Sequence, residues 1–189
     1  MSDIRFEIAD QVGIVRLDRS RAINALTGDM LVALEEQLVA WREDEQVSSV
    51  WLQGEGERGF CSGADVRAVR QLVLDDPDAA VAFFEQEYRL DALIANYPKP
   101  VTARLHGISM GGGLGLALHA SRVVVEVDLV LAMPETTIGL FPDVGVDFEV
   151  SRMPRQTGAW LVMTGESVDA FSAQWAGLVH EALDVADSG

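Results

Sequence analysis

Cysteine, histidine and lysine are scarce in this sequence of 189 residues, which contains one cysteine, three histidines and a single lysine. One cysteine cannot form an internal disulfide, and the scattered histidines show no metal-ligand spacing, so we expect neither a disulfide framework nor a metal site. Cys61 has no histidine nearby in sequence to activate it, which favours a small buried apolar role. Lys99 lies between two prolines at a predicted strand start, which favours an exposed side chain over Schiff-base chemistry.

Long apolar runs are also absent from the sequence. No segment is hydrophobic over the length needed to cross a bilayer, so we expect no membrane association. The first residues do not form a basic region followed by an apolar one, which is the pattern of an export signal. We therefore expect a cytoplasmic protein.

Positive charge is the third deficit. Lys and Arg total 14 against 30 Asp and Glu, which gives a formal net charge of -16 at pH 7. So acidic a chain repels nucleic acids and anionic membrane surfaces, and we expect neither as a partner. An anionic ligand would need local arginines, and Arg19 and Arg21 in a polar segment are candidates for a phosphate contact, although a solvated loop is the commoner role for such a pair.

Hydrophobic residues make up 49% of the chain, enough to bury a core, and no repeat or linker divides it, so we expect one α/β domain over residues 1–189. Alternating or continuous apolar residues predict strands at 4–8, 12–17, 50–52, 101–105, 123–125, 129–132 and 178–179. Helical spacing and capping residues predict helices after Thr27, after Asp65 and after Asp76, and two short ones within 157–164 and 167–176.

The segment 106–115, with sequence HGISMGGGLG, follows a predicted strand and leads into the apolar run 114–118. This order predicts a strand, a tight turn and a buried helix. Glycines allow backbone N–H groups to approach a ligand closely, and a helix start carries unpaired donors, so the turn suits an anion or a developing oxyanion. A turn that packs against its neighbours without a ligand remains the alternative.

A second turn of small residues lies at Gly63-Ala64-Asp65, where Asp65 suits the first turn of the next helix. Two such junctions, near Ala64 and near Gly112, could each offer one N–H to the same oxygen. The later loop 133–145 is rich in Pro and Gly and holds Glu135 and Asp143 among apolar neighbours. Apolar surroundings raise the pKa of a carboxyl, which suits a general acid or base, although either residue taken alone is more often a cap or a loop hydrogen-bonder.

The order Gly107-x-Ser109-x-Gly111, followed by Asp143 and His180, also matches the nucleophile elbow and acid–histidine order of a serine hydrolase. That fold needs several further strands after the elbow, and the remaining sequence has little strand pattern. We therefore expect Ser109 to be structural. His106 and His119 have no acid beside them in sequence and are expected to be structural as well.

Several segments in a fixed order together resemble the crotonase superfamily, also called the enoyl-CoA hydratase/isomerase family. The resemblance implies a spiral of ββα units, an acyl-CoA thioester as ligand and assembly as a trimer, with no cofactor apart from the coenzyme A of the substrate. It also implies a C-terminal helical region, which we do not expect within these 189 residues. The segments that carry the resemblance are Arg19 to Leu26, Gly59 to Val66, Lys99 to Val101, His106 to Gly113 and Pro134 to Gly145.

By this resemblance, the backbone N–H groups of Ala64 and Gly112 form an oxyanion hole for the thioester carbonyl. The Ser62 carbonyl is then expected to contact adenine, and Arg19 or Arg21 the phosphates. The full set of implied acyl-CoA contacts is Arg19, Arg21, Ser62, Asp65 and Gly111.

The acids distinguish the subgroups of this family. Hydratases of the family carry one catalytic glutamate where this chain has Gly115, and a second at the position of Glu135. The pair Glu135 and Asp143 instead resembles the 3-hydroxyisobutyryl-CoA hydrolases. We therefore expect hydrolysis of a short, hydroxylated acyl-CoA thioester, with Glu135 as nucleophile or general base and Asp143 placing water or the substrate hydroxyl. Hydratase or isomerase activity and a truncated, non-catalytic acyl-CoA-binding protein are the alternatives.

Overall fold

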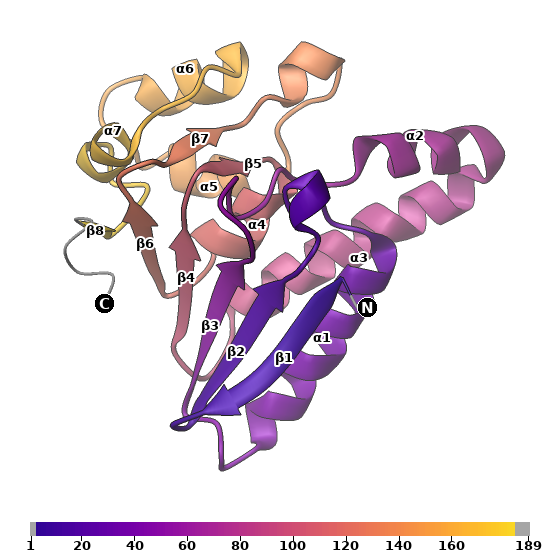
Figure 1. Cartoon of the computed structure of the whole chain (residues 1–189). Helices are drawn as coiled ribbons and strands as arrows, with labels where there is room; N and C mark the ends of the chain where they lie inside the picture. The colour runs from indigo at the N-terminus through magenta and orange to yellow at the C-terminus, as the bar shows by residue number, and fades with distance from the viewer. Residues whose placement is uncertain (1–2, 184–189) are drawn as a thin grey trace.

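A computed structural model describes residues 3–183. The large sheet has six strands in the order β1-β2-β3-β4-β6-β8 (Figure 1). The first two strands form an antiparallel hairpin, and every later neighbour in the sheet is parallel. The strands are β1 (Ile4–Ala9), β2 (Val12–Leu17), β3 (Ser49–Gly54), β4 (Val101–Leu105), β6 (Arg122–Glu126) and β8 (Glu181–Leu183).

A second, smaller layer lies across the end of the large sheet, where β5 (Ile108–Met110) pairs in parallel with β7 (Val130–Ala132) (Figure 1). Each of these strands directly follows a strand of the large sheet, β5 after β4 and β7 after β6. Isolated bridges from Gly59 to Gly107 and from Cys61 to Ser109 add the chain after β3 to the same layer. The repeated step from large sheet to small layer to helix is the predicted spiral of ββα units.

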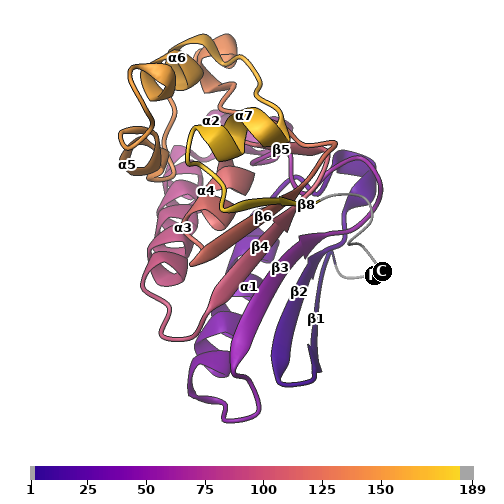
Figure 2. The same cartoon turned by 90° about the vertical axis from the view of Figure 1, so that its left-hand side faces the viewer.

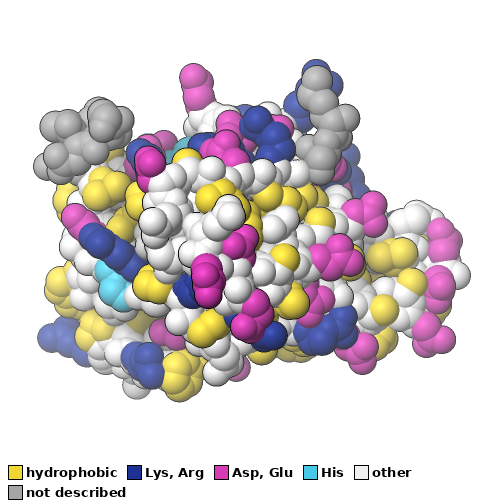
Figure 3. All heavy atoms as spheres, turned by 90° about the horizontal axis from the view of Figure 1, so that it is seen from below, with side chains coloured by type: hydrophobic (Ala, Val, Ile, Leu, Met, Phe, Trp, Pro, Cys, Tyr) yellow, Lys and Arg dark blue, Asp and Glu magenta, His cyan; other side chains and the backbone are white. Residues whose placement is uncertain are grey.

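Helices α1 and α3 cover one face of the large sheet (Figure 2). The other face carries ion pairs between neighbouring strands, such as Arg16 with Glu7 and Arg104 with Glu126. Figure 3, which shows the molecule from below relative to Figure 1, has acidic and basic side chains interspersed on that side. The helices are α1 (Gly28–Glu43), α2 (Val66–Asp75), α3 (Pro77–Ala95), α4 (Gly112–Leu118), α5 (Val146–Val150), α6 (Thr157–Thr164) and α7 (Ala170–Trp175), with 3-10 turns η1 (Ser20–Ala22) and η2 (Glu135–Ile138).

The predicted start of α1 is confirmed, because the Thr27 side chain accepts a hydrogen bond from the Met30 N–H and caps the helix. The predicted start of α3 is confirmed too, with Asp76 as the cap and Pro77 in the first turn. The apolar stripe of α1 is buried as its spacing predicts and packs into the core: Met30, Leu31, Leu34, Leu38 and Trp41.

Two details of the prediction are wrong. The Lys99 side chain is half-buried, and its Nζ donates to the carbonyl oxygens of Trp41 at 2.5 Å and Asp44 at 2.7 Å. A lysine suits that place, because the last carbonyls of α1 have no partner within the helix and carry partial negative charge. The last strand is β8 at 181–183 and not 178–179, because the chain joins β6 only from His180, whose N–H donates to the Val123 carbonyl.

Asn24 connects the loop after β2 to the loop after β3. Its side chain is completely buried, and its amide nitrogen donates to the carbonyls of Glu55, Gly59 and Phe60. Its amide oxygen accepts from the Arg19 N–H at 2.9 Å. These bonds fix the segment that leads from β3 into the turn at Ala64, so Asn24 supports the candidate site from behind.

We expect Asn24→Ala to lower the free energy of unfolding by about 3 kcal/mol, because two buried carbonyls and one half-buried carbonyl lose the donor that they share. The matched control is Asn96→Ala at the exposed end of α3, where one hydrogen bond to Ala92 is lost and the cost should stay below about 1 kcal/mol. Urea unfolding followed by circular dichroism measures both variants. Equal losses in the two variants would contradict a special role for Asn24.

Candidate active site

The two predicted turns of small residues lie next to each other. A Cβ placed on Gly112 would lie 3.5 Å from the amide nitrogen of Ala64, and one placed on Gly63 would lie 3.3 Å from the nitrogen of Gly112. Within residues 3–183, neither the Ala64 nor the Gly112 N–H donates to another backbone group. The structure therefore brings two backbone donors without a backbone partner close to each other.

Gly111 and Gly112 must stay small because carboxyl groups approach their backbone. Gly111 has a positive φ of 53°, and a Cβ there would lie 2.9 Å from Oε1 of Glu135. A Cβ on Gly112 would collide with the carboxylate of Glu87. The glycines thus allow acids from two different elements to lie beside the paired donors.

Glu135 begins η2 directly after β7 and is 8% exposed. Its Oε2 is buried and has no hydrogen-bond partner in the described residues. Burial is the main cause that raises the pKa of Glu135 to about 7; a backbone hydrogen bond opposes this rise, and the charge of Asp143 contributes to it. This carboxyl can exchange a proton near neutral pH, as its apolar sequence context predicts.

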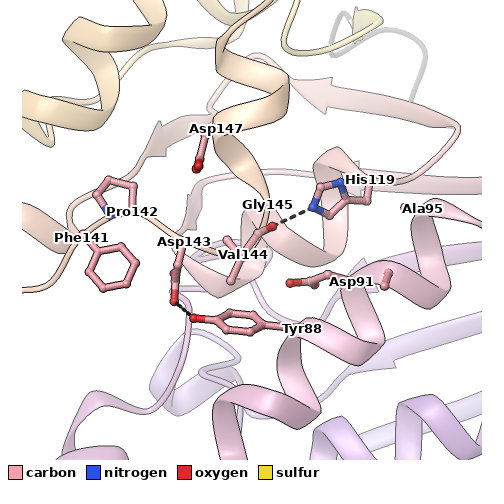
Figure 4. Close-up of a pocket in the computed structure, with 11 residues that line it drawn as sticks. Tyr88, Asp91, Ala95, His119, Phe141, Pro142, Asp143, Val144, Gly145 and Asp147 are labelled. Carbon is pink, nitrogen blue, oxygen red and sulfur yellow. Dashed lines mark hydrogen bonds between the residues drawn. The ribbon is translucent and has the colours of Figure 1, made fainter. Parts of the chain in front are cut away.

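Asp143 lies in the loop after η2, where its Oδ2 accepts a 2.5 Å hydrogen bond from the Tyr88 hydroxyl (Figure 4). Burial raises the pKa of Asp143, and the bond from Tyr88 opposes that rise. The next residue, Val144, has a φ of 49°, which is strained for a β-branched side chain. His119 holds this turn through a 2.7 Å hydrogen bond between its Nε2 and the Val144 carbonyl, which agrees with the structural role predicted for it.

The sequence interpretation missed two acids on α3. Glu87 and Asp91 are 2% and 4% exposed and lie one turn apart on the side of the helix that faces α4. The signal was present in the spacing, because positions 87 and 91 fall on the same helical stripe as the buried Phe83 and Ile94. A charged residue on an apolar stripe is the pattern that would have revealed them.

Both acids hold their protons at neutral pH. Burial is the main cause that raises the pKa of Glu87 to about 8, with a smaller contribution from the charge of Asp143. Burial is likewise the main cause that raises the pKa of Asp91 to about 9, with smaller contributions from the charges of Glu87 and Asp143. Oε1 of Glu87 and both carboxyl oxygens of Asp91 have no hydrogen-bond partner within residues 3–183. Unpaired buried carboxyls are costly, so these groups are suited to a partner that arrives with a ligand.

Asp91 occupies the space beside Gly115. A Cβ on Gly115 would lie 2.9 Å from each carboxyl oxygen of Asp91 and 2.7 Å from Cβ of Val144. α4 itself carries no acid at this position. A different carboxyl, supplied by α3, fills the neighbouring space.

Two cavities adjoin these acids. The larger has a volume of about 530 Å³ and is lined by residues of α3, by His119 and by the loop around Asp143 (Figure 4). The smaller has a volume of about 290 Å³ and is lined mainly by apolar residues such as Phe84 and Leu140. Tyr88 and Asp143 line both cavities.

The serine-hydrolase arrangement is not assembled. Ser109 is completely buried and its hydroxyl donates to the His106 carbonyl, while His180 Nδ1 accepts from the Val123 N–H. Asp143 bonds Tyr88 and neither of these residues. The expected burial of Cys61 is confirmed, and burial raises the pKa of its thiol to about 12, which makes it a poor nucleophile.

The residues expected to contact coenzyme A lie at the rim of the Ala64 turn. Arg19 forms an ion pair with Asp65 at 2.8 Å and donates to the Ala25 carbonyl, so its guanidinium already has partners. Arg21 is exposed and has no acid within ion-pair distance in the described part of the chain. The Ser62 hydroxyl donates inward to a carbonyl of η1. Contacts of these residues with coenzyme A remain predictions.

Residues 3–183 contain neither a cluster of metal ligands nor a helix that could cross a membrane. No group of three or more potential ligand side chains is arranged to hold a metal ion. No helix in this range combines the length and hydrophobicity needed to cross a membrane.

The sequence profile of the enoyl-CoA hydratase/isomerase family matches residues 12–188. The chain belongs to this family. The 3-hydroxyisobutyryl-CoA hydrolase, mitochondrial, of Danio rerio is 37% identical over 177 residues, which are 94% of this chain and 46% of that protein. The small ribosomal subunit protein mS47 of Neurospora crassa is 37% identical over 96% of this chain and 36% of its own length.

A crystal structure of a carnitinyl-CoA dehydratase from Mycobacterium thermoresistibile is similar with a TM-score of 0.95 and 38% identity, covering 97% of this chain and 54% of that one. The crotonase fold expected from the sequence is therefore confirmed. The chain spans about half the length of these family members or less.

We expect the protein to lose stability as pH rises from about 5 to 9. The unfolded chain releases the protons of Glu87 and Asp91 near their ordinary pKa values of 4.5 and 3.8, whereas the folded chain keeps them until about pH 8 and 9. The native state thus binds more protons within this window, and stability falls as pH increases. Tm measured by circular dichroism from pH 5 to 9 tests this.

Asp91→Asn should flatten the fall of Tm, because one of the titrating groups is gone. The control Asp78→Asn, at the exposed start of α3, should keep the slope of the parent protein. A Tm that stays constant or rises from pH 5 to 9 in the parent would contradict the burial of protonated acids.

Proposed function

We propose that this chain hydrolyses a short acyl-CoA thioester, with Ala64 and Gly112 binding the thioester oxygen and Glu135 acting on its carbonyl carbon. The observation that carries the proposal is the position of Oε1 of Glu135 beside Gly111, next to two backbone N–H groups that have no backbone partner. Similarity to proteins named 3-hydroxyisobutyryl-CoA hydrolase supports the choice of reaction.

The chemistry begins with the carbonyl oxygen. Two N–H donors stabilise the negative charge that develops on this oxygen, and removal of one such donor typically slows a reaction about a hundredfold or more. The carbonyl carbon then accepts either the Glu135 carboxylate or a water molecule from which Glu135 takes a proton. In both routes the thiolate of coenzyme A leaves and is protonated to the free thiol. In the first route, a water molecule then hydrolyses the anhydride between the acyl group and Glu135, which regenerates the carboxylate; both routes release the free carboxylic acid.

Asp143 has a positioning role in this proposal. The hydrogen bond from Tyr88 fixes one carboxyl oxygen of Asp143, which leaves the other free to orient water or a hydroxyl group of the substrate. The bond also favours the charged form of Asp143 over the neutral one. Glu135 and Asp143 can therefore hold different protonation states within one site.

Hydration of an enoyl-CoA is the second candidate. It needs two carboxyls on one water molecule, and the carboxyl of Asp91 beside Gly115 offers a second acid that the residues of α4 do not provide. The similar solved structure named as a carnitinyl-CoA dehydratase favours this chemistry. Loss of the enoyl absorbance of crotonyl-CoA tests hydration separately from thiol release.

Several parts of the proposal concern the whole protein. We propose that coenzyme A is bound near Arg21 and Ser62, that no cofactor is needed, and that subunits assemble as trimers. A cytoplasmic location is also a proposal, since the hydrolase of Danio rerio is named as mitochondrial. Sizing of the intact protein with and without acyl-CoA tests the assembly.

Glu135→Gln should abolish thiol release while the affinity for acyl-CoA changes less than about threefold, because the amide keeps the shape but cannot attack or accept a proton. A free-thiol assay over a panel of acyl-CoA thioesters, beside calorimetric binding, measures both quantities. The control Glu166→Gln changes an exposed glutamate outside the site and should leave turnover unchanged.

Normal turnover in Glu135→Gln would contradict the assignment. Loss of turnover in Ser109→Ala without loss of stability would favour the serine-hydrolase reading instead. Binding of every thioester without turnover by the parent protein would favour a binding-only protein.

A further inference from the structure

Asp91 is a buried acid that the proposed reaction does not use. Its side chain is 4% exposed, and neither carboxyl oxygen has a hydrogen-bond partner among the described residues. It nevertheless lines the 530 Å³ cavity, and Figure 4 shows its carboxyl pointing toward Val144 at the inner wall. A buried polar group without a partner, facing a cavity, is a site where a ligand can supply the missing hydrogen bonds.

The distance from the oxyanion hole fits an acyl group. Asp91 lies beside Gly115, and Gly115 follows Gly112 by three residues on α4, which is about 4.5 Å along the helix axis. A thioester carbonyl held by Gly112 would therefore bring a short acyl chain toward Asp91. A long acyl chain would extend beyond Asp91.

The charge of the cavity selects the kind of group that fits. Asp143 and Asp147 also line it, and no lysine or arginine does so among the described residues. Anionic acyl groups are repelled by these carboxyls. Burial keeps Asp91 protonated at neutral pH by raising its pKa to about 9, so it offers one donor and one acceptor, the same complement that a hydroxyl group carries.

We propose that Asp91 is a specificity-determining residue that hydrogen-bonds a hydroxyl group on the acyl chain of the substrate. Gly115 is required for this role of Asp91, because any side chain at position 115 would displace the Asp91 carboxyl or collide with Val144. The inference rests on the proposed placement of a thioester at Ala64 and Gly112. It adds the residue that distinguishes a hydroxylated acyl group from its deoxy analogue.

The test uses matched acyl-CoA esters with one carbon skeleton: isobutyryl, 3-hydroxyisobutyryl, 3-aminoisobutyryl and methylmalonyl. The parent protein should favour the hydroxy ester over isobutyryl by about tenfold or more in kcat/KM, as expected for one buried hydrogen-bonding site. Asp91→Asn should keep most of this ratio, because an amide also donates and accepts. Asp91→Leu should reduce the ratio to about one.

The ratio of the kcat/KM values for two substrates separates a change in specificity from damage to the fold, since a structural defect lowers both values together. The control Glu35→Gln changes an acid that bonds Gln86 on another side of α3 and should keep the parent ratio. If Asp91→Leu does not fold, Asp91→Ala replaces it with the same expected ratio. An unchanged ratio in the folded apolar variant, or a parent preference for the amino or methylmalonyl ester, overturns the proposal.

Failure of the proposed hydrolysis gives a different result from failure of the proposed role of Asp91. A parent protein that releases no thiol from any of the esters contradicts hydrolysis, and calorimetric affinities for the same esters then test Asp91. The parent should bind the hydroxy ester about tenfold more tightly than isobutyryl-CoA, and Asp91→Leu should remove that difference. Equal affinities in the parent would overturn the role of Asp91.

Discussion

The close approach of α3 to the glycine side of α4 is the contact on which the site depends. Side chains at Gly112 and Gly115 would occupy the space that the carboxyls of Glu87 and Asp91 fill. The absence of a Cβ lets the backbone of α4, with the unpaired N–H of Gly112, lie within reach of acids from another helix. Donors and acids meet here because α4 has glycine at the two positions that face these carboxyls.

This arrangement places polar groups where the core would otherwise be apolar. Glu87, Asp91 and Glu135 each have a buried oxygen without a partner in the described chain, and each has a raised pKa. Such groups weaken the folded state as they lose their protons, so the surrounding elements must hold them in place. Asn24 behind the Ala64 turn and His119 behind the strained Val144 do this through hydrogen bonds.

Local features of the fold were predictable because local forces produce them. The cap at Thr27, the proline start of α3 and the buried stripe of α1 depend on residues a few positions apart. The contact of Lys99 with the end of α1 was not predictable in this way. Lys99 bonds two carbonyls that lie 58 and 55 positions earlier in the chain, and nothing near Lys99 in sequence indicates which carbonyls it contacts.

The candidate site was also predictable only in part. The sequence alone determined that two turns of small residues precede helices, that Glu135 and Asp143 lie in one apolar loop, and that position 115 is a glycine, because residue type and order carry this information. Only the tertiary structure decided that both turns converge, that Tyr88 binds Asp143, that Glu87 lies beside Gly112 and that Asp91 lines the larger cavity. Which side of α3 meets α4, and how closely, is decided by packing between segments that are distant in the chain.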